Sequence, residues 1–415
     1  MESPLICLIT PGHVSSTPRL VKNADSLAQA GYRVHVVAGA PSPKFDSLDN
    51  DIVAKARWGY TRVETRSGPG VLLRKAARLY SRRLVTFFGA STPSIAEQAH
   101  YAHTKRLSCV AAGVRAQLYL GHCLAALPVA AHAAGKNSCG YGFDMEDFHD
   151  AETEEAMRDN VEVAVRRAIQ GRLLPQAKPL LAASPLISEQ CLKAYGVEPR
   201  ILLNVFPLAD APAAAQSRPP ISTENPAILY WFSQTVGPGR GLEDAIAVMG
   251  KMRVPAEMHL RGFVSAGYEA RLQSLALAAG LARPLRFLPP GSPAEMARLA
   301  AAADMGLSIE LQTPLNRDIC LPNKIFVYLL AGIPQAMSTT TAQLSFSREL
   351  GAAALPIDLA RPDGAAAILD SFLSDPDRVQ RARLAAVSLS RSRYCWDVES
   401  QVLLELIQAA LPAAR

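Results

Sequence analysis

A glycine-rich turn at residues 233–246 (SQTVGPGRGLEDAI) is the first segment whose residue types could bind a ligand. It follows an apolar stretch that predicts a strand, and glycines stand at 237, 239 and 241 before a helical pattern begins. Backbone N–H groups at a helix N-terminus bind phosphate, and Arg240 adds a bidentate donor beside them. The spacing matches neither the dinucleotide-binding fingerprint nor a Walker loop. We therefore predict a phosphate site at Arg240 and Gly241, with an ordinary turn as the alternative.

A second candidate lies in residues 309–338, where Glu310 ends a predicted strand and Asn316 lies in a polar loop. Pro322 then starts a helix that carries Lys324 near its N-terminus. A cation there opposes the helix dipole, so Lys324 is expected to face an anion; extension of its side chain into solvent is the alternative. We treat Arg240 and Lys324 as surface cations, whose removal should leave folding intact.

Acidic residues crowd the segment GYGFDMEDFHD at 140–150, directly after another predicted strand. They are Asp144, Glu146, Asp147 and Asp150, with His149 among them. One carboxylate could accept a proton or orient a sugar hydroxyl. A divalent-metal site is an alternative, because hard cations take carboxylate oxygens. An acidic cluster that merely starts a helix is another.

Gly12 and His13 follow the first predicted strand. A glycine lets the backbone approach a ligand, and a histidine could act as a base or a hydrogen-bond donor. A turn glycine with a solvated histidine is the alternative.

Residues 71–88 (VLLRKAARLYSRRLVTFF) have the spacing of an amphipathic helix. Its predicted faces are an apolar one with Leu73, Ala77, Tyr80, Leu84 and Phe87, and a basic one with Arg74, Arg78 and Arg82. Such a helix could make peripheral contact with an anionic membrane through Val71 to Phe88. Packing on the protein's own core is the alternative.

Two series of alternating strands and helices must position these residues. They predict two doubly wound α/β domains, at residues 1–208 and 227–395, joined by a Pro/Ala/Ser-rich linker at 209–226 and followed by a terminal helix at 396–415. Ligands of such sheets bind beyond the carboxyl ends of the strands.

Composition narrows the class of protein. The chain has 415 residues with a net charge of +6 and 6% aromatic residues, which does not favour a nucleic-acid partner. Its seven cysteines are scattered, which argues against a disulfide framework or a zinc site. We expect no transmembrane helix or signal peptide, and a cytoplasmic location that could include the inner face of the cell membrane.

Taken in order, these segments resemble glycosyltransferases of the family-4 type with the GT-B fold. The LPNK-IF-V-Y-LLAGIP string resembles their donor-site helix, and the glycine-rich turn resembles their loop that usually carries lysine where Arg240 stands here. The opening β-α-β unit at 11–37, the segment at 184–208 and the closing helix CWDVESQVLLELI are also similar. The resemblance implies two Rossmann-like domains facing across a cleft, with the C-terminal helix returning toward the N-terminal domain.

The resemblance implies that the protein transfers a sugar from a nucleotide-sugar to an acceptor in polysaccharide biosynthesis. The implied acceptor is a glycan, a lipid-linked molecule or a small molecule. The transfer would retain the anomeric configuration and use no bound metal and no cofactor. The implied catalytic residues are Asp144, His13, Arg240 and Lys324. The implied donor-binding residues are Gly12, Arg240, Gly241, Glu310, Asn316 and Lys324. The implied acceptor-side residues are His122, Glu146 and Asp147.

One departure from the family pattern concerns ribose binding. Relatives often carry a Glu-x7-Glu pair where this sequence has Ile319 and Val327, neither of which accepts a hydrogen bond through its side chain. Glu310 or Asn316 would then bind the ribose. The alternatives are a catalytically inactive GT-B binding or scaffold subunit and a metal-dependent transferase that uses Asp144 and Glu146.

Overall fold

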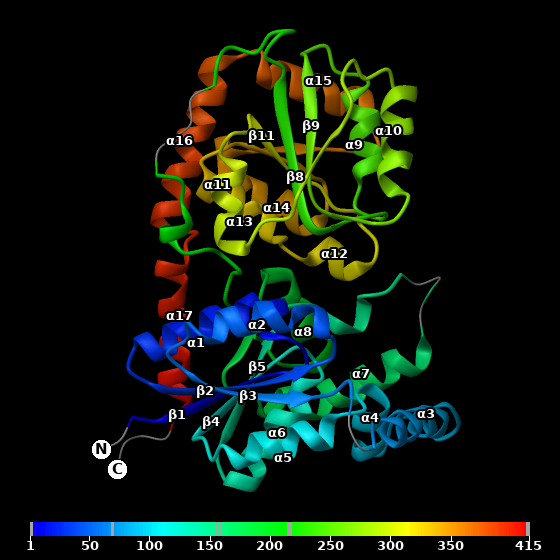
Figure 1. The fold of residues 1–415 in the computed structure, drawn as a ribbon, viewed down its shortest axis with the longest axis vertical. Helices are drawn as coiled ribbons and strands as arrows, with labels where there is room; N and C mark the ends of the chain where they lie inside the picture. The colour runs from blue at the N-terminus through cyan, green and yellow to red at the C-terminus, as the bar shows by residue number, and fades with distance from the viewer. Residues whose placement is uncertain (1–2, 68–69, 155–156, 158, 214–217, 412–415) are drawn as a thin grey trace. The chain divides into compact units, whose positions relative to one another are not determined.

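The computed structural model describes residues 3–67, 70–154, 157, 159–213 and 218–411, which form two α/β units (Figure 1). Unit 1 comprises residues 1–202 with 400–415, and unit 2 comprises residues 203–399. Each unit has its own parallel sheet covered by helices, which confirms the predicted fold class.

Unit 1 contains a seven-stranded parallel sheet in the order β3-β2-β1-β4-β5-β6-β7. The strands are β1 (Leu5–Thr10), β2 (Arg33–Ala40), β3 (Gly59–Glu64), β4 (Leu118–His122), β5 (Gly140–Met145), β6 (Leu180–Ala182) and β7 (Arg200–Ile201). The order reverses between β1 and β4, so the loops after these two strands diverge and leave room for ligand-binding groups. The central strands are continuous apolar runs because helices cover both faces of the sheet.

In the described residues of 1–202, α-helices connect these strands or extend the unit. They are α1 (Pro18–Gln29), α2 (Asp46–Val53), α3 (Val71–Phe88), α4 (Pro93–His100), α5 (Thr104–Gly113), α6 (Ala126–Asn137), α7 (Asn160–Leu173) and α8 (Pro185–Tyr195).

Unit 2 contains a six-stranded parallel sheet in the order β10-β9-β8-β11-β12-β13. The strands are β8 (Ala227–Val236), β9 (Ala256–Val264), β10 (Arg286–Leu288), β11 (Met305–Ser308), β12 (Gln335–Ser338) and β13 (Ala354–Ile357). The helices are α9 (Leu242–Met249), α10 (Tyr268–Ala278), α11 (Met296–Ala300), α12 (Leu315–Ile319), α13 (Asn323–Ala331), α14 (Thr341–Leu350), α15 (Pro362–Leu373), α16 (Pro376–Ser392) and the start of α17 (Trp396–Ala410).

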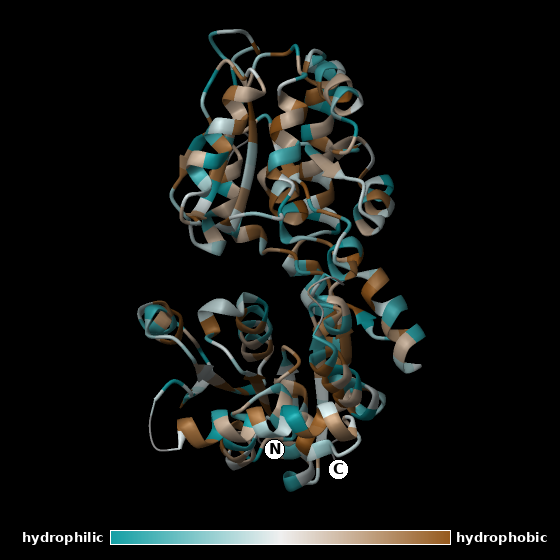
Figure 2. Cartoon of the chain, turned by 90° about the vertical axis from the view of Figure 1, so that its right-hand side faces the viewer, coloured by the Kyte–Doolittle hydropathy of each residue, from teal (hydrophilic) through white to brown (hydrophobic). Residues whose placement is uncertain are grey.

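Two apolar clusters hold the helices of unit 2 on its sheet. One joins the strands to α9, α10 and α15 around Trp231 and Leu260. The other joins α11 and α13 around Tyr230 and Tyr328. Along most helices hydrophobic and hydrophilic residues alternate (Figure 2), as expected where one side of a helix rests on a sheet.

The elements predicted around the candidate residues are present, with shifted ends. The strand expected near 137–143 is β5 at Gly140–Met145, and the helix expected at 152–171 is α7 at Asn160–Leu173. The strand expected at 201–208 is reduced to the two residues of β7. Of the expected linker at 209–226, residues 214–217 lie outside the described residues.

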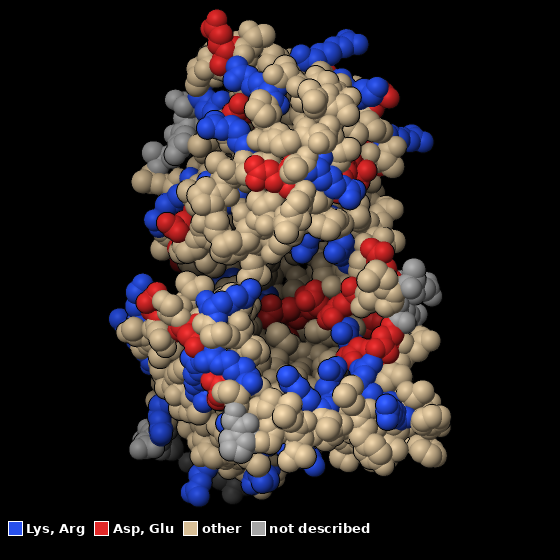
Figure 3. All heavy atoms as spheres, turned by 45° about the vertical axis from the view of Figure 1, so that its right-hand side comes forward, with Lys and Arg blue, Asp and Glu red and all other residues tan. Residues whose placement is uncertain are grey.

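Basic and acidic side chains are interspersed on the surface (Figure 3). Within the described part of the chain, no helix combines the length and the apolar composition needed to cross a bilayer.

Candidate functional site

In unit 2, the loops after β8 and β11 bring Arg240, Glu310 and Lys324 together. These two strands are parallel neighbours, so their carboxyl ends lie at one edge of the sheet. Lys324 Nζ lies 2.9 Å from Glu310 Oε1, and Arg240 Nη1 lies 3.9 Å from Glu310 Oε2. The two cations predicted to act as a pair therefore share one carboxylate.

Lys324 is buried in the first turn of α13, against the ring of Trp231, whose centroid lies 5.0 Å from Nζ. The expectation that a lysine opposed to the helix dipole faces an anion is met by Glu310. The expectation that Lys324 is a surface cation is wrong, because its side chain is only 8% exposed. Arg240 is 38% exposed and does lie at the surface.

The glycine-rich turn ends in a helix N-terminus without a side-chain cap. Gly241 occupies the N-cap of α9 with φ of 73°, a left-handed conformation that favours glycine. Because no side chain caps the first amides of α9, these N–H groups can face an anion. Arg317 Nη1 donates a hydrogen bond to the carbonyl of Gly239, so a second arginine stands at this turn. Arg317 lies in α12, and no spacing rule in the sequence connected it with residue 239.

Glu310 keeps an acceptor available. Its Oε1 accepts from Lys324, whereas its buried Oε2 accepts no hydrogen bond in the structure. Asn316, in α12, is buried, and its Oδ1 lies 3.2 Å from Cys320 Sγ. Ile319 and Val327 are also buried and pack among apolar residues, as their side chains would suggest.

In unit 1, the loop after β1 is held by His13. The His13 ring is 1% exposed; Nδ1 lies 2.6 Å from Asp49 Oδ2, and Nε2 accepts the backbone N–H of Ser42 at 3.0 Å. Because Nε2 accepts from Ser42, Nδ1 is the ring nitrogen that donates to Asp49. Transfer of a proton through Nε2 would require the bond from Ser42 to break. Neither Asp49 nor Ser42 was identified from the sequence.

Gly12 lies between this histidine and the end of β1. Its N–H donates to Thr10 Oγ1 at 3.3 Å, and a Cβ at this position would meet no atom within 4 Å. The backbone at Gly12 is therefore open to a ligand.

Asp144 lies in β5 and forms a buried ion pair with Arg19 from α1. Arg19 Nε and Nη2 donate to its two carboxylate oxygens at 2.7 and 2.8 Å, and Asn23 Nδ2 lies 3.3 Å from Oδ2. Burial opposes ionisation, but the charge and hydrogen bonds of Arg19 prevail, so the pKa of Asp144 lies below its ordinary value. Asp144 is thus a permanent carboxylate. Arg19 was not identified from the sequence because it is 125 residues away from its partner.

His122 ends β4 directly beside Asp144 in the register of the sheet. Its Nδ1 lies 3.6 Å from both Asp144 Oδ2 and Glu146 Oε1, yet neither ring nitrogen makes a hydrogen bond in the structure. Asp147 follows in the same loop and is half-buried. The structure therefore brings His122 together with Glu146, as expected for the acceptor side, but does not test their role.

The remaining acidic residues of this loop serve unit 1 itself. Asp150 is buried and accepts hydrogen bonds from Tyr195 and Gln170, and Glu152 lies 2.7 Å from Arg166 in α7. Among the described residues, no group of three or more His, Cys, Asp or Glu side chains is arranged to hold a metal ion.

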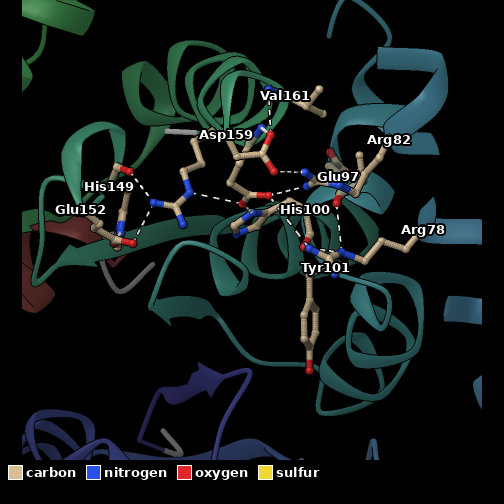
Figure 4. A network of polar contacts seen from close by, with 12 residues as sticks. Arg78, Arg82, Glu97, His100, Tyr101, His149, Glu152, Asp159 and Val161 are labelled. Carbon is tan, nitrogen blue, oxygen red and sulfur yellow. Dashed lines mark hydrogen bonds and ion pairs between the residues drawn. The ribbon is translucent and has the colours of Figure 1, made fainter. Parts of the chain in front are cut away.

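The helix predicted at 71–88 is present as α3, but its basic side faces the protein. Arg78 Nε donates to the carbonyl of Ala99 at 3.1 Å, and Arg82 Nη1 donates to Glu162 Oε2 at 2.6 Å (Figure 4). Arg78 and Arg82 therefore hold α3 on α4 and α7, and the expected contact of Val71 to Phe88 with a membrane stays a prediction. Helical spacing shows which residues share a side, not which side the rest of the protein covers.

Comparison with known proteins identifies the fold. No family model and no curated protein sequence matches the chain. HepE (Alr3699) of Anabaena, solved in complex with UDP and glucose, matches with a TM-score of 0.70 and 14% identity over 98% of this chain and 100% of that chain. Sucrose-phosphate synthase of Thermosynechococcus elongatus matches with a TM-score of 0.71 and 14% identity over 98% of both chains.

A third solved structure, the lipopolysaccharide outer core galactosyltransferase WaaB, matches with a TM-score of 0.63 and 11% identity over 98% of this chain and 100% of that chain. At such low sequence identities, structural similarity is evidence for a shared fold alone. It shows that this chain has the two-domain GT-B fold of these glycosyltransferases.

Proposed function

We propose that this protein is a glycosyltransferase of the family-4 type that moves a sugar from a nucleotide-diphosphate donor to a glycan, lipid-linked or small-molecule acceptor in polysaccharide biosynthesis. We further propose that it retains the anomeric configuration and needs no metal or cofactor. The observation that carries the proposal is the convergence of Arg240 and Lys324 on Glu310, beside the uncapped N-terminus of α9.

Charge supports a diphosphate at this position. Arg240, Arg317 and Lys324 carry three positive charges, and Glu310 offsets one of them. The remaining two positive charges and the first amides of α9 would bind the diphosphate of the donor. The same groups would stabilise the charge that develops on the leaving phosphate as the glycosidic bond breaks.

The carboxylate of Glu310 would determine which way the donor lies in the site. A carboxylate repels phosphate, so the diphosphate would lie on the side of the arginines and the turn. The acceptor oxygen Oε2 would then receive a hydroxyl of the ribose or of the sugar. This role would replace the carboxylates that relatives carry where Ile319 and Val327 stand, and Asn316 would assist it.

We assign the acceptor side to unit 1. Gly12 would let the backbone approach the sugar, and His122 and Glu146, with Asp147, would bind acceptor hydroxyl groups. Asp144 would act as a fixed charge that orients His122, and His13 would hold the loop that carries Gly12. WaaB acts on lipopolysaccharide, and a lipid-linked acceptor would bring this protein to the inner face of the cell membrane through Val71–Phe88.

Calorimetric titration with UDP-, GDP- and ADP-sugars, followed by a donor-hydrolysis assay with and without EDTA, tests the proposal. We expect one class of donor to bind and to be hydrolysed in EDTA, and Arg240→Ala to weaken binding at least about tenfold. Arg361→Ala, which removes an exposed arginine of unit 2, is the matched control.

Failure of every nucleotide-sugar to bind would overturn the proposal. Tight binding of a nucleotide-sugar without turnover on any acceptor would favour an inactive scaffold subunit. The specific argument for that alternative is that Ile319 and Val327 stand where relatives carry a carboxylate pair. Activity abolished by EDTA would favour a metal-dependent transferase.

A further inference from the structure

Six large apolar side chains of α3 are exposed. They are Leu72, Leu73, Leu79, Tyr80, Phe87 and Phe88, with exposed fractions from 63% to 81%. They make up six of the seventeen exposed large apolar side chains of the described residues, within a single helix of 18 residues. Apolar residues concentrated in this way mark an interaction surface.

Hydrogen bonds from the opposite side of α3 hold that side against the protein, so the apolar side faces outward. The buried side holds Ser81 and Val85, and next to them Arg82 donates hydrogen bonds to both Glu162 and Asp159 (Figure 4). His100 adds a third partner to Glu162, with Nδ1 2.7 Å from Oε1. An ordinary surface helix buries its apolar side, whereas α3 exposes six large apolar side chains and packs Arg78 and Arg82 against the protein.

We propose that the exposed apolar side of α3 inserts into the headgroup region of an anionic lipid bilayer, with the helix lying along the surface. This inference rests on the membrane contact of the proposed function and names the side of the helix that makes it. The side chains that enter the lipid are the six apolar ones, while Arg78 and Arg82 stay on the protein side.

Charge favours an anionic bilayer as the partner. Residues 65–96 contain six basic residues and no acidic one. Lys75 and Arg83 are exposed on α3 itself. Burial together with the charges of Arg74, Arg106 and Lys75 lowers the pKa of His103, which places these cations around the start of α5. Basic side chains beside an apolar helix face are the combination that binds anionic lipid.

The same charges argue against a second copy of the chain as the partner. A two-fold pairing of α3 with itself would place Lys75 and Arg83 of both copies in one interface. With no acidic residue in 65–96 to compensate, such a pairing would bring like charges together.

Co-sedimentation of the full chain with vesicles tests the inference. We expect binding to vesicles of phosphatidylcholine with phosphatidylglycerol, and little binding to phosphatidylcholine alone. The double variant Phe87→Ser/Phe88→Ser should weaken binding to the anionic vesicles at least about tenfold. Lys75→Gln/Arg83→Gln should weaken it several-fold and reduce its sensitivity to salt. Leu277→Ser, which alters an equally exposed leucine of unit 2, should change nothing.

Three outcomes would overturn the inference: no binding to anionic vesicles, equal binding to both kinds of vesicle, or unchanged binding of the Phe87/Phe88 variant. Self-association that this variant abolishes, measured by sedimentation without vesicles, would assign the surface to a second copy instead. Titration of the donor without vesicles keeps the two proposals separate. Vesicle binding without donor binding would overturn the sugar transfer alone, and the Phe87/Phe88 variant should bind the donor normally.

Discussion

At the scale of single residues, two buried ion pairs set the electrostatics of the candidate sites. Lys324 with Glu310 in unit 2 and Arg19 with Asp144 in unit 1 are both removed from solvent. In each pair the loss of one partner leaves a buried charge uncompensated, which costs far more than the loss of an exposed ion pair. Substitution of one partner should therefore destabilise the fold as well as change the candidate site.

Lys324→Ala should lower the free energy of unfolding by roughly 3 kcal/mol, because it strands the carboxylate of Glu310. Arg240→Ala should cost less than about 1 kcal/mol, since Arg240 is partly exposed and lies 3.9 Å from Glu310. Urea denaturation of both variants measures the difference, and equal losses would contradict the ion-pair geometry. The double variant Lys324→Met/Glu310→Gln should recover much of the lost free energy of unfolding.

If the proposed function holds, the single variants Lys324→Ala and Arg240→Ala should each lose roughly a hundredfold or more in turnover.

At the scale of elements, the start of one helix and the exposed side of another carry the candidate binding features. The start of α9 is uncapped because Gly241 has no side chain that could cap it. The orientation of α3 depends on Glu162, which accepts hydrogen bonds from His100, Arg82 and Arg166. Both features depend on contacts that single residues make with neighbouring elements.

The contribution of Glu162 should depend on pH. Burial alone would raise its pKa, but hydrogen bonds and charges from His100, Arg82 and Arg166 lower it to about 2 from the ordinary 4.5. A lowered pKa in the folded state stabilises the fold above the unfolded-state pKa, and this stabilisation is lost as pH falls from 4.5 toward 2. The difference in unfolding free energy between the native chain and Glu162→Gln should therefore be largest near neutral pH and shrink by pH 3. A difference that stays constant with pH would disprove this role.

Gly241→Ala should weaken the binding of nucleoside diphosphate as well as the fold. Gly241 has φ of 73° and Gly280 has φ of 76°, so alanine at either position should cost about 1 kcal/mol of stability. Gly280, which follows α10 and has no atom within 4 Å of an added Cβ, is the control for this backbone strain. Calorimetry should show weaker binding for Gly241→Ala alone, and equal weakening in both variants would exclude a phosphate site at this turn.

At the scale of the whole molecule, the chain passes between the two units twice. It passes from unit 1 to unit 2 after Leu202 and returns after Glu399. The two crossings are tied together, because the N–H of Leu203 donates to Glu399 Oε1 at 2.5 Å. The single helix α17 therefore starts in unit 2 and ends as part of unit 1.

Leu403→Ala should destabilise unit 1 even though residue 403 lies near the C-terminus. Leu403 is fully buried in the part of α17 that belongs to unit 1, so its truncation should cost roughly 2–5 kcal/mol. Hydrogen exchange should show lost protection in β1 and β4 and unchanged protection in β8 and β11. Gln401→Ala, an exposed change in the same helix, should have no effect, and a loss in β8 instead would contradict the division of α17.

The two α/β series, the fold class and the segments that hold the candidate residues could be predicted from the amino-acid sequence. Continuous apolar strands, helical periodicity and glycine at a helix start are local patterns, and local patterns are visible along a chain. The tertiary structure alone decided which distant groups meet: Arg19 with Asp144, Asp49 with His13, and Arg317 with the carbonyl of residue 239. It also decided that Lys324 is buried and that Arg78 and Arg82 of α3 face the protein, because burial and facing depend on contacts between segments that are far apart in the sequence.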